Sequence, residues 1–372
     1  MRSSERFIQR VLLAILHRCA VRPPCAPENV PLASLKKILV VRQHDQLGDL
    51  LIATPAIRAL RLRFPDAFIA VVVRDYTRPM IENNPNIDKL IIFHDKLAGW
   101  TWAEAKRFWR ELRGGGGFDC AVVLNTVSRS FSSDLIALLS RARYIVGPDH
   151  IRHDDVLPEK IYNVVAHRDP RKKTEIEHNL DVVRVLGAVP DSLEYDLVPT
   201  NEERIEAENI FLSLGIPKGK LVVGVHFGTL AVPRRYPLEK LAEVIDAVIV
   251  SYDAEVVLIV GPHEIEKRKY LLSLLHHRVA SAPLMPIRVS AAFMNHLDLF
   301  IGNDTGTLHI ASARRIPTVA FYGPNDPAVW KPPHERHFAV IAPDRIIPSI
   351  PVAQTLAVIA EAVGYIVAAR RT

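Results

Sequence analysis

"LDLFIGNDTGTLHIASARRIPTVAFYG", residues 297–323, carries the pattern that decides the fold. The apolar run over 297–303 predicts a strand, and residues 307–315 have the apolar spacing typical of a helix. A second run rich in β-branched and aromatic residues, 317–323, predicts the next strand. A strand, a helix and a strand in this order are typical of a parallel sheet with a crossover helix.

The same alternation extends over most of the chain. Further apolar runs that predict strands occupy residues 36–42, 68–74, 89–94, 119–125, 221–227 and 255–261. Helical patterns occupy residues 49–64, 237–252 and 351–370. A polar, proline-bounded segment interrupts the alternation, and we place a linker there, over 191–203. The sequence thus predicts an α/β protein with two domains of similar size, and two such domains that face each other create a central cleft at the carboxyl ends of their strands.

These patterns set the expected domain boundaries. The 372 residues are enough for two domains of ordinary size, each with its own core. We expect an N-terminal extension over 1–35, a first domain over 36–190, a second domain over 204–348, and a C-terminal helix over 349–372.

Charge and cysteine content limit the class of partner and compartment. The net charge of +6 favours anionic partners such as nucleotide phosphates or an acidic membrane surface. Nucleic acid is a weaker interpretation, because no long Lys/Arg tract or known nucleic-acid module is present. The three cysteines form no CxxC pair, which argues against a disulfide framework or a cysteine zinc site and fits a reducing compartment.

The N-terminal extension contains "RFIQRVLLAILHRCAVRPP", which forms a basic amphipathic pattern when placed on a helix. Its apolar core is too short to span a bilayer, and its charged positions suit a signal peptide poorly. Two interpretations remain open: a helix that lies on an anionic membrane, or a helix that packs on its own protein. The chemistry is expected in the cytoplasm, either free or peripheral on the inner membrane.

The first group of candidate site residues lies in "RQHDQLGDLLIATPAIRAL", which begins with Arg42. It contains no G-x-G-x-x-G, which counts against a dinucleotide site. Gly48 is expected to permit a tight turn, and Asp49 stands at the start of a helix. Asp49 either caps that helix or acts as a general base toward an incoming hydroxyl. His44 and Asp45 are nearby candidates for the same role.

The second group follows the strand at 221–227. Thr229 supplies a hydroxyl after that strand, and the adjacent Arg234 and Arg235 could bind both phosphates of a diphosphate. The alternative is a solvated basic pair before a helix. Glu264, in "GPHE" after a neighbouring strand, could contact a ribose or a base.

The third group lies where the strand at 297–303 gives way to a helix. The first turn of a helix offers unpaired N–H groups and a positive dipole end, both of which favour a phosphate. Around it stand a carboxylate, two hydroxyls, a glycine and a histidine: Asp304, Thr305, Gly306, Thr307 and His309. The alternative is that Asp304 or Thr305 only caps the helix and that His309 packs inside.

Taken together, these motifs resemble glycosyltransferase family 9, the ADP-heptose:lipopolysaccharide heptosyltransferases. The resemblance covers residues 36–333 and is strongest in "LGDLLIATPAIRALR" and in "GNDTGTLHIASA" followed by "IPTVAFYGPNDP". It implies a GT-B fold, in which two Rossmann-like domains face a cleft and a last helix crosses back to the first domain. It also implies an acceptor site in the N-terminal domain and a nucleotide-sugar site in the C-terminal domain.

The resemblance implies specific roles. Asp49 matches the proposed catalytic base of the family, and Asp304, Thr305, Gly306 and His309 match its donor-binding segment. Three positions depart from the family pattern: Arg234 replaces a lysine, Tyr236 a tryptophan, and Asn325 a threonine. Arg42, Asp45 and Gly48 are expected on the acceptor side or in a structural role.

The expected function is inverting transfer of heptose from ADP-heptose to an inner-core lipopolysaccharide sugar. No metal or other cofactor is expected, because cationic side chains and a helix start can stabilise the diphosphate. The alternatives are a relative that uses another nucleotide sugar or a protein acceptor, and a non-catalytic module that binds nucleotide or glycan.

Overall fold

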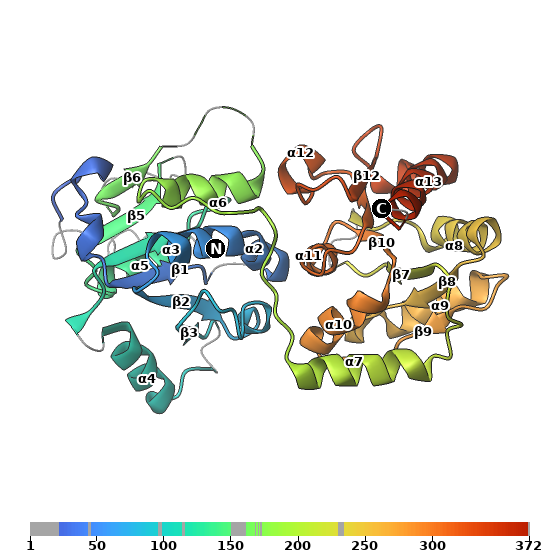
Figure 1. Ribbon diagram of the computed structural model, residues 1–372, viewed down its shortest axis with the longest axis horizontal. Helices are drawn as coiled ribbons and strands as arrows, with labels where there is room; N and C mark the ends of the chain where they lie inside the picture. Colours follow the sequence, from blue (N-terminus) through green and yellow to red (C-terminus); the bar gives the residue numbers. More distant parts are fainter. Residues whose placement is uncertain are drawn as a thin grey trace, which may run out of the picture. The chain divides into compact units, whose positions relative to one another are not determined.

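The computed structural model describes residues 22–43, 46–95, 99–113, 116–149, 161–167, 169, 171, 173–229 and 234–370. The chain divides into two compact units, Met1–Asp196 and Leu197–Thr372 (Figure 1). The N-terminal segment up to residue 21 and the candidates His44 and Asp45 lie outside the described residues.

The first unit contains a parallel sheet of six strands in its described part, in the order β3-β2-β1-β4-β5-β6. The strands are β1 (Lys37–Val41), β2 (Phe68–Arg74), β3 (Lys89–Phe93), β4 (Cys120–Val123), β5 (Tyr144–Pro148) and β6 (Val164–Ala166). The helices are α2 (Leu47–Ile52), α3 (Thr54–Arg63), α4 (Trp102–Arg113), α5 (Phe131–Leu139) and α6 (Glu175–Arg184).

The second unit repeats this architecture, with the strand order β12-β11-β10-β7-β8-β9 in a parallel sheet. Its strands are β7 (Val222–His226), β8 (Glu255–Leu258), β9 (Ala280–Ser281), β10 (Leu299–Asn303), β11 (Thr318–Tyr322) and β12 (His337–Ile341). Its helices are α7 (Asn201–Ser213), α8 (Leu238–Tyr252), α9 (Ile265–Leu274), α10 (Ile287–Phe293), α11 (Gly306–Ala313), α12 (Pro327–Trp330) and α13 (Val352–Ala369).

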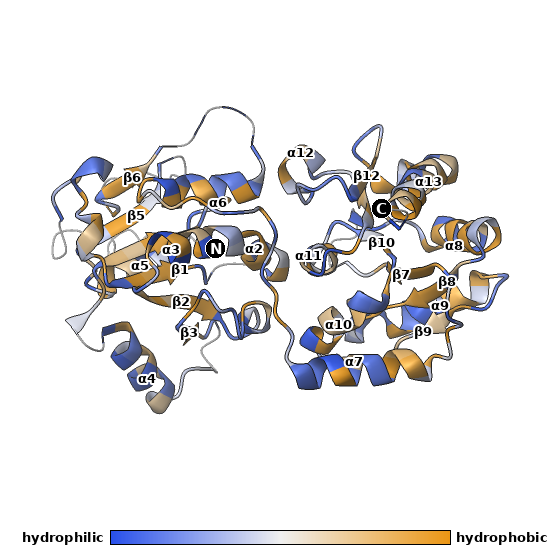
Figure 2. Cartoon of the chain, in the orientation of Figure 1, coloured by the Kyte–Doolittle hydropathy of each residue, from blue (hydrophilic) through white to orange (hydrophobic). Residues whose placement is uncertain are grey.

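The central strands form because their residues are apolar on both faces, as a sheet covered by helices on both sides requires. Four of the five residues of β1 are buried, and β10 is buried throughout. Figure 2 shows hydrophobic colours along the strands and hydrophilic stretches on the outer helices. Each unit therefore has its own core, and the predicted α/β class with two Rossmann-like sheets is confirmed.

Two expectations about the ends of the second unit were wrong. Helix α7 begins at Asn201, inside the expected linker, because Thr200 and Glu203 form a capping box that starts the helix there. Helix α13 was expected to cross back to the first domain. Its buried residues instead lie in the core of the second unit, where it packs against α8, β11 and β12.

Among the described helices, α13 is the one long and apolar enough to span a bilayer by length and composition.

Candidate active site

The order of the strands creates one topological switch point in each unit. Chain connections run outward in opposite directions from β1 and β4 in the first sheet, and from β7 and β10 in the second. The loops that follow such strands diverge and leave a crevice at the carboxyl ends, where ligands of open parallel sheets bind. The candidate residues that follow these four strands are therefore placed at the functional edge of each sheet.

A cavity of about 240 Å³ lies at this edge of the first unit. It is lined by Arg42, Gln46, Asp49, Arg74, Asn125, Val127 and Ser128. Arg42 directly follows β1, Arg74 ends β2, and Asn125 lies just beyond β4, so three adjacent strands bring these side chains together. Two guanidinium groups, a carboxylate and two amides make a wall suited to a hydroxylated ligand.

Asp49 caps its helix and also lines the cavity. It is the third residue of α2, and its Oδ2 accepts the backbone N–H of Gln46 over 3.2 Å, so it helps to cap that helix. The half-buried carboxylate also lines the cavity. In the described part of the chain no other hydrogen bond to this carboxylate is formed, so Oδ1 has no partner among the described residues.

Two neighbours of Asp49, Gly48 and Arg42, lie within the described residues. Gly48 is buried as the second residue of α2 and does not have a positive φ, so the tight turn predicted there was wrong. Arg42 is 1% exposed and its Nη2 lies 3.3 Å from the backbone oxygen of Asp49. Arg42 therefore contacts both the cavity and the helix that carries Asp49.

Sequence reasoning did not name Arg74 and Asn125 as site residues, although they are the last residues of the strands predicted at 68–74 and 119–125. The side chain of Asn125 is 4% exposed, and its Oδ1 has no hydrogen-bond partner in the described chain. A polar residue at the end of an apolar run is the signal that could have found both. A polar residue at a strand end points to a shared site only when the order of the strands in the sheet is known.

In the second unit, α11 begins directly beyond β10, as the third group of residues suggested. Thr305 is its N-cap residue, but its side chain makes no capping hydrogen bond. The Thr305 hydroxyl is buried and has no partner in the described chain. Gly306 and Thr307 are the first two helical residues, where backbone N–H groups lack intrahelical acceptors. The helix start thus presents unused donors, as an anion site does.

The residues next to this helix start are held by side-chain amides. Asn325 donates a hydrogen bond to Oδ2 of the buried Asp304. Asn303 accepts the backbone N–H of Tyr236 at 3.0 Å and donates to the Phe227 carbonyl at 2.9 Å. The loop after β7 is therefore tied to the end of β10, and Asp304 is positioned by Asn325.

The basic pair lies on the loop after β7. Nη2 of Arg235 donates to the carbonyl of Thr229 over 3.1 Å, while its buried Nε has no partner in the described chain. Arg234 is half-buried and forms no ion pair with any described residue. The structure thus leaves donor capacity on both arginines.

Glu264 lies at the same edge, in the short turn Pro262–Glu264 after β8. Its Oε2 accepts the backbone N–H of Gly261 over 2.9 Å. A Cβ placed on Gly228 would lie 2.8 Å from the Glu264 carboxyl carbon, so only glycine at 228 leaves room for this carboxylate. Nδ1 of His226 bonds to the Ile259 carbonyl at 2.8 Å, and burial lowers the pKa of His226.

His309 lies in α11 and is 4% exposed. Its side chain is therefore packed inside the second unit, as one of the two interpretations of the motif expected. A nearby buried histidine, His337, contacts the hydroxyl groups of Ser312 at 3.1 Å and Thr318 at 2.9 Å. These contacts join α11, β11 and β12. Within the described ranges, no group of three or more His, Cys, Asp or Glu side chains could hold a metal ion.

Comparison with known proteins adds an independent observation. The sequence profile of Glycosyltransferase family 9 (heptosyltransferase) matches residues 105–349, more than half of the chain. The chain belongs to glycosyltransferase family 9. It is therefore a glycosyltransferase, as the resemblance implied.

Two curated relatives and one solved structure extend this match. A Haemophilus influenzae protein named "Putative glycosyltransferase" is 30% identical over 83% of this chain and 90% of its own length. The Lipopolysaccharide heptosyltransferase 3 of Escherichia coli is 26% identical over 77% of this chain and 83% of its own length.

The solved structure is similar in fold. The E. coli heptosyltransferase WaaC with ADP matches this glycosyltransferase with a TM-score of 0.69 at 18% identity, over 88% of this chain and 99% of the other. At that identity the likeness concerns the fold, and the expected GT-B class is confirmed.

Proposed function

We propose that this family 9 glycosyltransferase moves heptose from ADP-heptose to a sugar of the lipopolysaccharide inner core. The names of its relatives support this choice, since one is a lipopolysaccharide heptosyltransferase and a structural neighbour was solved with ADP. The observation that carries the donor assignment is the buried hydroxyl of Thr305, which has no partner in the described chain and stands at the start of α11.

The donor diphosphate is assigned to the second unit. The N–H groups of Gly306 and Thr307, the hydroxyl groups of Thr305 and Thr307, and the helix dipole would hold its oxygens. Arg234 and Arg235 would neutralise the charge that grows on the leaving group. Glu264 is assigned to the nucleoside, and Asp304 and His309 shape the floor of the site. With this set of donors we propose that transfer needs no metal.

Asp49 is the proposed general base. Its Oδ1 takes the proton of an acceptor hydroxyl while that oxygen forms a bond to the anomeric carbon of the donor sugar. The bond between that carbon and the diphosphate oxygen breaks, and ADP leaves with the electron pair. Attack opposite to the leaving group inverts the anomeric configuration. Arg42, Arg74 and Asn125 surround the cavity in which the acceptor sugar would lie.

A lipopolysaccharide acceptor is anchored in a membrane by its lipid. We therefore assign the enzyme to the cytoplasm, with peripheral contact at the cytoplasmic face of the inner membrane. The net charge of +6 supports attraction to an anionic lipid surface. A second candidate is a family relative with a different nucleotide sugar or a protein acceptor, since the three departures at Arg234, Tyr236 and Asn325 lie in the donor unit.

Thermal unfolding with different nucleotides separates these candidates. ADP, ADP-heptose, UDP and GDP are each added to the purified protein in the presence of EDTA. A ligand at one hundred times its dissociation constant adds about 2.7 kcal/mol to the unfolding free energy. Stabilisation by ADP and ADP-heptose alone is expected. Stabilisation by UDP or GDP instead would mean that the donor sugar carries a different nucleotide. Dependence of the ADP effect on a divalent ion would overturn the proposal that transfer needs no metal.

A further inference from the structure

We propose that the outer face of α4 is the surface with which this enzyme contacts an anionic lipid membrane. We define the outer face of α4 as its exposed residues: Trp102, Ala103, Lys106, Arg107, Trp109 and Arg110. The inference rests on the proposed function, because a lipid-anchored acceptor is what brings the enzyme to a membrane. It assigns this contact to a particular surface of the first unit.

Helix α4 is attached to its unit through its opposite side. Phe108 makes edge-to-face contacts with Phe93 and Trp100, at centroid distances of 5.9 and 5.3 Å. Leu112 is fully buried in the core of the first unit. Since these residues anchor the helix, the exposure of the outer face is a property of a packed helix and not of a frayed one.

Two tryptophans stand on the outer face. Trp102 is 92% exposed and Trp109 is 43% exposed. They are seven residues apart, which is close to two turns, so both project from the same side of the helix. A large aromatic side chain left almost wholly in water is unusual on a soluble surface and indicates a contact site. Tryptophan is enriched at the interface of membranes, where its ring lies among the headgroups.

The outer face of α4 carries three positive charges, of which Lys106 and Arg110 are not engaged in ion pairs with described residues. The two acids of the helix are engaged: Glu104 pairs with Nη2 of Arg107 at 2.6 Å, and Glu111 pairs with Lys89 at 3.1 Å. Basic side chains beside tryptophans on one helix face complement an anionic headgroup layer.

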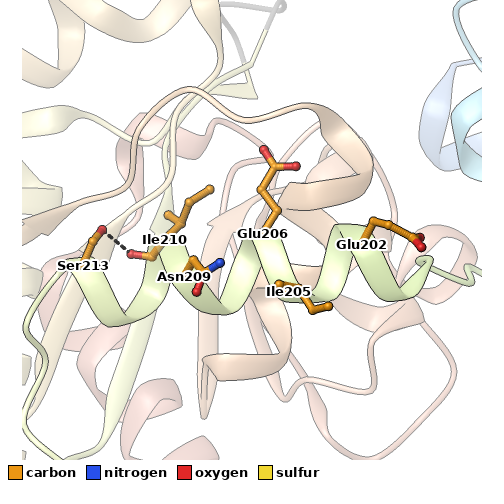
Figure 3. Close-up of a pocket in the computed structure, with 6 residues that line it drawn as sticks. All are labelled: Glu202, Ile205, Glu206, Asn209, Ile210 and Ser213. Carbon is orange, nitrogen blue, oxygen red and sulfur yellow. Dashed lines mark hydrogen bonds between the residues drawn. The ribbon is translucent and has the colours of Figure 1, made fainter.

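Helix α7 also exposes apolar side chains, as α4 does, but the charged side chains beside them include carboxylates. Ile205 and Leu212 are 60% and 64% exposed on α7. Glu202 and Glu206 line a surface hollow beside α7, and Figure 3 shows both side chains on this helix. Anionic lipid would be repelled there, so charge selects α4 and not α7 as the membrane contact.

The direction of α4 connects this face with the proposed acceptor cavity. The C-terminal part of α4 contributes Arg110 to a cavity of about 300 Å³ that also contains Lys37, Phe68 and Lys89, the first residues of β1, β2 and β3. The end of α4 therefore lies at the amino edge of the sheet, and its start, Trp102, lies toward the carboxyl edge. That is the edge at which Asp49 lines its cavity.

Vesicle flotation of the full chain tests the proposal. Vesicles of phosphatidylglycerol and phosphatidylcholine are compared with phosphatidylcholine alone. The native protein is expected to float with the anionic vesicles. The double variant Lys106→Gln/Arg110→Gln should bind more weakly by about fivefold for each positive charge removed. The matched control Lys218→Gln/Arg278→Gln removes two exposed cations from the second unit and should float as the native protein does. Equal binding of both double variants would overturn the proposal.

Tryptophan fluorescence gives a second, local readout. Trp102 and Trp109 should shift their emission to shorter wavelength on anionic vesicles, because their rings leave water. The variant Trp102→Phe/Trp109→Phe keeps an apolar face and should lose this shift. An unchanged shift in that variant would place the contact elsewhere, and so would an absence of any shift in the native protein. Removing an exposed apolar group from α7 by Leu212→Ala should leave flotation unchanged.

The proposed function and this surface can fail independently. Transfer from ADP-heptose to a deacylated, lipid-free core oligosaccharide should be the same in the native protein and in Lys106→Gln/Arg110→Gln. If that transfer occurs and vesicle binding is insensitive to α4, the surface is wrong and the function stands. If α4 governs vesicle binding and ADP-heptose is not a donor, the function is wrong and the surface stands.

Discussion

The backbone N–H of Gln46 donates a hydrogen bond to Oδ2 of Asp49 over 3.2 Å, while the same carboxylate lines a cavity at the carboxyl edge of the first sheet. The bond fixes the orientation of the carboxylate without using both of its oxygens. A side chain that caps a helix and also faces a ligand cavity is preorganised for proton transfer. The capping and catalytic interpretations of Asp49 are therefore compatible.

The hydroxyl of Thr305 yields the first prediction. Replacing it by valine, a residue of similar shape, removes a buried oxygen that has no partner in the described chain. The unfolding free energy should stay the same or rise by about 1 kcal/mol, because a buried unsatisfied polar group is destabilising. The affinity for ADP, measured by calorimetry, should fall.

Thr200→Val provides the matched control for that substitution. The hydroxyl of Thr200 caps α7 through the N–H of Glu203, so its loss should cost about 1 kcal/mol and leave ADP affinity unchanged. If Thr305→Val destabilised the protein as Thr200→Val does and bound ADP normally, the hydroxyl would have a purely structural role.

Gly228 provides the second prediction, through its contact with Glu264. An alanine Cβ at this position would lie 2.8 Å from the Glu264 carboxyl carbon and 2.9 Å from Cε1 of His226, and the flexible Glu264 side chain is the group that can move away. Gly228→Ala should therefore weaken ADP binding about as much as Glu264→Ala does. The double variant should be little weaker than either single variant, because both act on one contact. Additive losses in this cycle would show that Gly228 does not act through Glu264.

His337 supplies a prediction about acid stability. Burial is the main cause that lowers its pKa from 6.5 to about 2, and nearby cationic groups add to this. The unfolded chain then binds a proton that the folded chain excludes, so stability is complete above pH 6.5 and falls as the pH drops below it. Between pH 7.5 and 5.5 this one group should cost about 1.4 kcal/mol.

Urea unfolding at the two pH values measures that loss. In His337→Gln the amide can still meet the hydroxyls of Ser312 and Thr318, and it does not titrate. This variant should be less stable at neutral pH and should lose about 1.4 kcal/mol less than the native protein on acidification. If the unfolding free energy fell equally in both proteins between pH 7.5 and 5.5, His337 would be taking up its proton in the folded state.

The elements of the fold were predictable because their signals are local. The apolar runs at 36–42 and 68–74 became β1 and β2 with ends shifted by one residue at most, and the helix at 237–252 became α8. Parallel pairing followed from the alternation of strands and helices. The capping box that starts α7 within the expected linker is also a local signal, and its Thr-x-x-Glu pattern was available in the sequence.

The composition of the cavity was not predictable in the same way. Arg74 and Asn125 come from strands on either side of β1, and only the order β2-β1-β4 brings them to Asp49. The expectation that the carboxyl-terminal helix crosses back to the first domain came from the family resemblance, and the pattern of the helix itself could not correct it. Its apolar face fits any exposed sheet surface, and the pattern does not say which of two sheets it covers. The order of the strands and the packing of the last helix depend on contacts between distant parts of the chain, which the periodicity of the sequence does not reveal.

The turnover of Asp49→Asn tests the central claim most directly. Transfer of heptose from ADP-heptose to a heptose-deficient core acceptor is measured beside ADP-heptose affinity, with Asp66→Asn as an exposed control in the same unit. Asparagine keeps the shape and cannot accept the proton, so kcat should fall roughly 100- to 10,000-fold while donor affinity is unchanged. Asp66→Asn should behave as the native enzyme. A variant Asp49→Asn that transfers heptose at the native rate would contradict the account.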